Sequence, residues 1–223
     1  MSLHLVNNRE ANDLVNQAVV AIVSWKDPMP YIERVQELHP NHFFTLIFLL
    51  LAEVLGTGVD LTSDAIVNQV KTVKDIYDTQ FVNDAASCGS TGSTGVDARF
   101  LEQFSVFMKG VFQFAQGEMK LATETMELFI AESELGAGKR VTTNDSEHDD
   151  QAPIVVNGNV QELNRTLALL ALKVNHDCYF YLGQSTDICQ SVERVIDRVE
   201  AIYGRSIYGY ALGMYAFGLE ETY

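Results

Sequence analysis

Three neighbouring residues, His176, Asp177 and Cys178, form the closest grouping of chemically active side chains in the sequence, and Cys189 follows them. A thiol near an imidazole and a carboxylate is the composition of a cysteine nucleophile, and the same residue types bind metals. On a helix, however, adjacent residues point about 100° apart, whereas metal ligands sit at i and i+4 or come from separate elements. We therefore expect no catalytic residue, metal or cofactor here.

We interpret His176 instead as a hydrogen-bonded residue in a helix interface, and the two cysteines as small buried residues. The sequence contains no GxSxG, HExxH, P-loop or dinucleotide glycine motif. The GSTGSTG run from Gly89 lacks the lysine of a phosphate-binding loop. These features predict that the protein is not an enzyme, and an enzyme of unknown reaction is the least favoured alternative.

The helices expected to carry these residues belong to a pattern of apolar positions that occurs twice in the sequence. Apolar residues on one helical face follow each of two glycines at equal offsets: Ala122, Met126 and Phe129 after Gly117, and Ile188, Val192 and Val195 after Gly183. Glycine adopts left-handed dihedrals without steric cost, so each glycine predicts the corner of a helix-turn-helix.

Seven residues before each corner, helical-hairpin repeats place a small side chain where the two helices come close. Gly110 occupies that position in the first unit, and His176 occupies it in the second. A third corner at Tyr223 would place Ala216 there, on a helix from about Arg205 to Glu221 that lacks its partner helix.

This pattern resembles the tetratricopeptide repeat, a helix pair of about 34 residues. The segment HDCYFYLGQSTDICQSVERV, followed by YGYALGMYAFGLEET, resembles the tetratricopeptide repeat protein 38 family. The segment VSWKDPMPYIERVQELHPNHFFTLIFLLLAEVLGTG resembles that family's N-terminal region, and ARFLEQFSVFMKGVFQFAQGEMKLATETMELFI lies between them. The resemblance implies an all-α fold, a right-handed α-solenoid of antiparallel helix hairpins, in a truncated or N-terminal portion of a longer repeat protein. It implies no established reaction.

Five segments are expected. They are N-terminal helical repeats over 1–84, a flexible linker over 85–96, a helix-turn-helix repeat over 97–132, a disordered acidic insertion over 133–159, and a repeat plus half-repeat over 160–223. In the first segment we expect a helix over 12–23, a helix starting at Asp27 and Pro28 and stopping near Pro40, a helix ending at Gly56, and a helical stripe from Ile66 to Tyr77.

Composition excludes several classes of partner. The formal net charge of −15 disfavours binding to nucleic acid and to anionic membranes. The longest apolar run, Phe43 to Ala52, is shorter than the roughly 20 residues that a bilayer requires, so it predicts a helix buried on several faces. Three cysteines without a CxxC pair, and no signal-like N-terminus, predict a cytoplasmic protein.

In tetratricopeptide arrays the first helix of each pair lines a concave groove that receives a peptide or a partner helix. The resemblance implies that each groove residue lies at a fixed distance in sequence from its corner. On that basis the groove is lined by Phe107, Lys173, Asp177, Tyr181, Tyr210, Phe217 and Glu220. We therefore predict a non-catalytic helical-repeat scaffold whose concave face binds another protein or peptide. The alternative is a structural subunit that self-associates into a homo-oligomer through its exposed C-terminal half-repeat.

Overall fold

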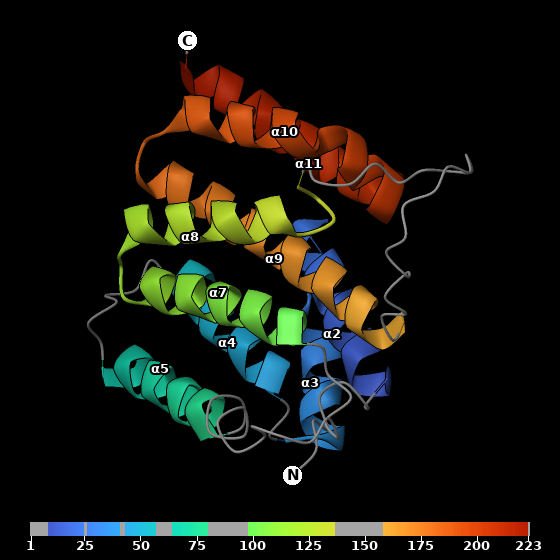
Figure 1. The fold of residues 1–223 in the computed structure, drawn as a ribbon, viewed down its shortest axis with the longest axis vertical. Coiled ribbons are helices and arrows are strands. Elements are labelled where there is room, and N and C mark those ends of the chain that lie inside the picture. Colours follow the sequence, from blue (N-terminus) through green and yellow to red (C-terminus); the bar gives the residue numbers. More distant parts are fainter. Residues whose placement is uncertain are drawn as a thin grey trace.

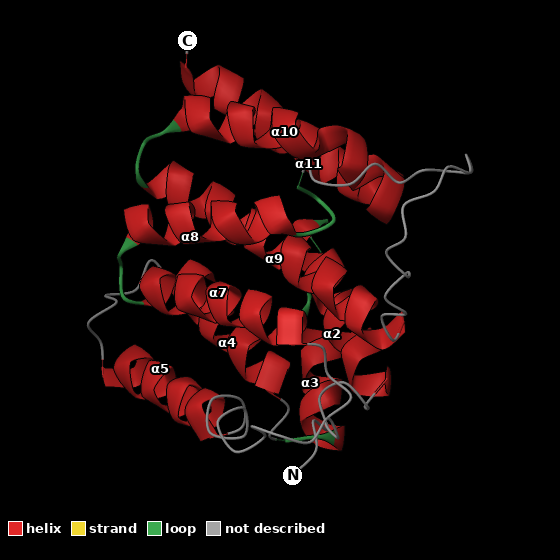
Figure 2. Cartoon of the chain, in the orientation of Figure 1, coloured by secondary structure: helices red, strands yellow, loops and turns green. Residues whose placement is uncertain are grey.

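The computed structural model describes residues 9–24, 26–40, 43–56, 64–79, 98–136 and 158–222, and every regular element among them is helical (Figures 1 and 2). The packing of the helices is compatible with a helical repeat, and the all-α prediction is confirmed for this part of the chain. The helices are α2 (Arg9–Val23), α3 (Met29–Leu38), α4 (Phe43–Gly56), α5 (Asp64–Tyr77), α7 (Ala98–Ala115), α8 (Met119–Glu132), α9 (Gly158–Tyr181), α10 (Ser185–Tyr203) and α11 (Arg205–Thr222).

The N-terminal helices begin and end close to where the sequence predicts. The Oδ1 atom of Asp27 accepts a hydrogen bond from the backbone N–H of Met29 at 2.9 Å, and so satisfies one of the free amides at the start of α3. In α4, consecutive residues such as Phe43 and Phe44 are both buried, as are Leu50 and Leu51. The prediction that this apolar run is a helix buried on several faces is confirmed.

Both predicted corner glycines have left-handed backbones. Gly117 has φ of 79° between α7 and α8, and Gly183 has φ of 67° between α9 and α10. A third glycine, Gly204, has φ of 77° and ends α10, so that α11 begins at Arg205 as predicted. The sequence did not single out Gly204.

Small residues lie at close helix contacts on α7 and on α11. A Cβ atom added at Gly110 would lie 2.8 Å from Cε of Met126, which confirms a close approach of α7 and α8. On α11 the close contact is at Gly218, where a Cβ atom would lie 2.7 Å from Sγ of Cys189. Ala216, the small residue expected to face a partner helix after α11, is exposed among the described residues.

An aromatic cluster joins the N-terminal helices to the middle of the chain. The ring of Phe104 on α7 lies 6.1 Å from the ring of Phe43 on α4 and 5.9 Å from that of Tyr77 on α5, as measured between centroids. Phe100 and Phe107, one turn away on either side along α7, stack on the same ring at 5.8 and 6.4 Å. Aromatic rings contribute large buried areas, so this cluster fixes α4 and α5 against α7.

The helices form a stack, with α5 towards one end and α10 and α11 together at the other (Figure 1). The N-terminal helix α2 packs on α3 and also on α9, and it touches α11. The Thr166 hydroxyl on α9 donates a hydrogen bond to Oδ1 of Asn16 on α2 at 3.0 Å. In a linear repeat array each unit contacts only its neighbours. The α2–α9 contact departs from that arrangement.

The predicted linker at 85–96 and residues 137–157 of the predicted insertion lie outside the described residues. Residues 133–136 form a turn after α8, and residues 158 and 159 belong to α9. Among the described residues, no helix combines the length and apolar character needed to cross a membrane.

Candidate functional site

His176 lies at the interface between α9 and α11. Its side chain is fully buried, and its Nδ1 atom is 3.0 Å from the hydroxyl of Tyr210 on α11. Burial lowers the pKa of His176 to about 3, and the positive charges of Lys173 and Arg194 act in the same direction. The imidazole is therefore neutral at neutral pH. The prediction of a hydrogen-bonded interface histidine is confirmed.

The neighbours of His176 face different surroundings. Asp177 forms an ion pair with Lys173 one turn earlier on α9, and burial nevertheless raises the pKa of the Asp177 carboxyl. Cys178 is buried beside Sδ of Met119 at 3.9 Å, and burial raises the pKa of its thiol to about 12. A thiol with so high a pKa is a poor nucleophile at neutral pH.

Cys189 is also buried, with 7% of its surface exposed, so both described cysteines are small buried residues as predicted. Neither of them forms a disulfide in the described part of the chain. Across the same residues, no group of three or more His, Cys, Asp or Glu side chains is placed to hold a metal ion.

A polar cluster that the sequence did not reveal joins three helices at Glu127 on α8. Its Oε1 atom accepts hydrogen bonds from Nη2 of Arg194 at 2.6 Å, Nδ2 of Asn175 at 2.7 Å and the hydroxyl of Tyr179 at 3.1 Å. Burial, and secondarily the Glu127 charge, raise the pKa of Tyr179 to about 12, so its hydroxyl remains a donor. Because the three donors come from α9 and α10, the cluster holds α8, α9 and α10 together.

The most accessible apolar side chains at the end of α9 form what we call the Phe180 patch, made of Phe180, Tyr181, Leu182 and Phe217. Phe180 is 55% exposed and Tyr181 50% exposed, and their ring centroids lie 5.7 Å apart. The Phe180 ring also lies 5.6 Å from the ring of Phe217 on α11. Contiguous exposed aromatic surface of this kind is characteristic of sites that bind other molecules.

The residues assigned to the groove fall into two groups. Phe107 is fully buried against Phe129, with 5.4 Å between ring centroids, and Tyr210 is only 5% exposed, so neither side chain is accessible to a partner. Lys173, Asp177 and Tyr181 lie four residues apart along α9 and share one face of it.

On α11, Phe217 contacts the patch through Phe180, and Glu220 is exposed. The sequence assignment missed Phe180 and Leu182. The run of aromatic and apolar residues from Tyr179 to Leu182, directly before the corner at Gly183, was the available signal, because a helix end cannot bury every face.

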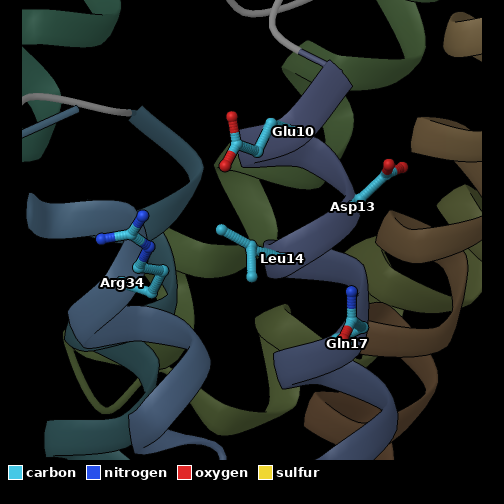
Figure 3. A pocket seen from close by; sticks show the side chains of 5 residues that line it. All are labelled: Glu10, Asp13, Leu14, Gln17 and Arg34. Carbon is cyan, nitrogen blue, oxygen red and sulfur yellow. The ribbon is translucent and has the colours of Figure 1, made fainter. Parts of the chain in front are cut away.

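Two hollows lined by described residues lie elsewhere on the surface. One of about 510 Å³ lies between α2 and α3 and is lined by Glu10, Asp13, Leu14, Gln17 and Arg34 (Figure 3). Arg34 is paired with Glu37 on its own helix at 2.8 Å. This hollow combines charges of both signs around an apolar side chain.

The second hollow, of about 400 Å³, lies between α2, α9 and the C-terminal helices. Two of its lining residues are bonded to each other, since the Tyr203 hydroxyl donates to the carbonyl of Arg165 at 2.6 Å. Nε of Arg165 donates to Glu134, outside the lining, at 2.7 Å. These contacts brace the end of α10 against α9.

Searches against protein-family models and against solved structures found no match to this chain.

Proposed function

We propose that the protein is a non-catalytic helical-repeat scaffold that binds another protein or a peptide through the Phe180 patch and the adjoining face of α9. The observation that carries the proposal is the aromatic cluster in which the exposed rings of Phe180 and Tyr181 lie beside the partly buried ring of Phe217. Aromatic side chains are enriched at binding hot spots, because they bury a large area at a low cost in side-chain entropy.

The ion pair of Lys173 and Asp177 lies on the same face of α9 as Tyr181. Its side chains are 14% and 18% exposed, so the pair presents only a small polar surface of both signs beside the aromatic anchor. The net charge of −15 favours encounter with a basic partner. We therefore propose a partner segment with an apolar or aromatic anchor flanked by Lys or Arg.

The finer architecture is part of the proposal. We propose that α7 with α8, and α9 with α10, are antiparallel hairpins of a right-handed solenoid related to the tetratricopeptide repeat protein 38 family. The left-handed corners at Gly117 and Gly183 and the close approach at Gly110 support it. A cytoplasmic location is proposed on the same terms, supported by the two unpaired cysteines of the described chain.

The proposal is tested by screening a peptide array and measuring the affinity of the best binder. Replacing Phe180 and Tyr181 together by Ala removes the centre of the patch, and we expect at least a tenfold loss of affinity, since a hot-spot residue contributes roughly 2 kcal/mol or more. Leu128→Ala is the matched control, because Leu128 is an apolar side chain 63% exposed on α8, away from the patch. Equal binding by the double variant and the control would contradict the proposal.

The ion pair is tested separately by exchanging its members. A variant carrying Lys173→Asp and Asp177→Lys keeps an attractive pair on α9 but reverses its polarity. If the partner contacts these charges, the affinity falls by more than any change in stability explains. Urea unfolding measures that change, because the pair is largely buried. An unchanged affinity would confine the site to the Phe180 patch.

A further inference from the structure

The outward face of α11 is apolar along most of its length. Residues spaced three and four apart lie on this face and are exposed: Arg205, Gly209, Leu212, Gly213, Ala216, Leu219 and Glu220. Leu212 is 43% exposed and Leu219 38% exposed. Nothing lies within 4 Å of a Cβ atom added at Gly209 or Gly213.

The opposite face of α11 is already buried. Ile207, Tyr210, Ala211 and Gly218 face the interior, and the helix packs along α10. A surface helix normally presents polar residues on the side away from the core. On α11 the outward side carries charge only at its two ends, with Arg205 near the start and Glu220 near the end.

We infer that the outward face of α11 binds the same face of a second copy of this chain, with the two helices antiparallel. Aligned about a twofold axis between Leu212 and Gly213, each Leu212 lies opposite Gly213 of the other copy. Gly209 then lies opposite Ala216, so that small residues let the helix axes approach to about 8 Å.

Charge complementarity selects a second copy as the occupant. In the same alignment Arg205 of each copy lies opposite Glu220 of the other, which gives two attractive pairs across the interface. A twofold interface must complement itself, and a face with a cation at one end and an anion at the other does so only when antiparallel. The ends of the two helix dipoles are also oppositely placed in that arrangement.

The overall charge of the chain also favours the outward face of α11 as the surface that binds a second copy. At −15, two copies repel each other over most of their surfaces. The outward face of α11 carries one positive and one negative residue among apolar ones, so it presents no net charge to a second copy. None of the Phe180 patch residues is aligned across this contact, although Phe217 lies on α11 one turn before Glu220. The inference does not rest on the proposed function.

The test is the mass of the purified chain by sedimentation equilibrium over a range of concentrations at 0.15 M salt. We expect the mass to rise from 24.8 kDa towards twice that value. Arg205→Glu places two carboxylates opposite each other at both ends, and Glu220→Arg does the same with two cations. Each change is expected to raise the dissociation constant roughly tenfold, because it converts two attractive exposed pairs into repulsive ones.

The double variant, with both changes, restores opposite charges and is expected to dimerise as the parent chain does. Glu221→Arg is the matched control, since Glu221 is exposed at the same end of α11 but off this face, and it is expected to leave the dissociation constant within about twofold. All three substituted positions are at the surface, so circular dichroism is expected to show unchanged helicity.

A chain that stays monomeric at the highest concentration would overturn the inference. So would a dimer that both single variants leave intact, because it would use another surface. A dimer weakened by the single changes but not restored by the double variant would overturn the antiparallel alignment. Peptide binding to the Phe180 patch is measured separately, so failure of one proposal is distinguishable from failure of the other.

Discussion

Protonation of His176 should destabilise the folded protein as the pH falls below the ordinary pKa of histidine. The folded-state pKa is lowered to about 3 by burial and by two nearby cations, while an unfolded chain has a histidine pKa of about 6.5. The unfolded state therefore binds more protons between these values. Stability is fully present above about pH 6.5 and is lost as the pH falls towards 3.

The magnitude follows from the same two pKa values. At pH 7.5 the unfolded histidine is almost wholly neutral and the loss is near zero, whereas at pH 5.5 it is about 1.4 kcal/mol. The assay is urea unfolding, followed by circular dichroism, at pH 7.5, 6.5 and 5.5. His176→Gln removes the titrating group, so its stability should fall by about 1.4 kcal/mol less than that of the parent chain between pH 7.5 and 5.5.

The matched control is Tyr210→Phe, which removes the hydroxyl that lies 3.0 Å from Nδ1 of His176 but keeps the buried imidazole. It should lose stability at every pH and keep the steep pH dependence. The comparison uses the slope against pH, so a changed baseline in either variant does not affect it. Parallel curves for His176→Gln and the parent chain would refute the reasoning, since the pH dependence would then come from other groups.

Two further predictions concern contacts between helices, one through hydrogen bonds and one through close packing at glycine. Both are measured by urea unfolding at pH 7.5. Glu127→Ala should cost about 2 kcal/mol, because it removes the acceptor at 2.7 Å from the fully buried amide of Asn175 and leaves that amide only the longer contact of 3.5 Å with the Ser191 hydroxyl. The exposed Glu124 on the same helix is the control, and equal losses for the two alanine variants would contradict the prediction. Gly218→Ala should cost about 1–3 kcal/mol, because the new methyl group would lie 2.9 Å from a backbone carbonyl of α10. Gly110→Ala should cost less, since its methyl group meets the flexible end of the Met126 side chain. A larger loss of stability for Gly110→Ala than for Gly218→Ala would contradict the prediction.

Local features of this fold could be predicted from the sequence. The corners at Gly117 and Gly183 were predictable because a left-handed backbone favours glycine, and the helices around them follow a 3.6-residue apolar period. The start of α11 at Arg205 followed from the same repeat. Each of these features depends on residues close together in the chain.

Contacts between distant segments could not be predicted in the same way. The Glu127 cluster and the contact of Phe180 with Phe217 depend on how helices rotate against one another, which spacing along one helix does not encode. The same rotation explains why Phe107 and Tyr210, assigned to a groove by their distance from a corner, are buried. The apolar period of a single helix identifies its buried face, but it does not show which neighbouring helix covers that face.

The contact between α2 and α9 has a consequence for the way the chain is made. Asn16 and Thr166, which are hydrogen-bonded in the folded protein, are 150 residues apart in sequence. At a synthesis rate of about 5–20 residues per second, roughly 8 to 30 seconds separate their emergence from the ribosome. During that interval the surface of α2 that α9 will cover is accessible to chaperones and to neighbouring nascent chains, and the N-terminal helices complete their packing only after translation has passed Thr166.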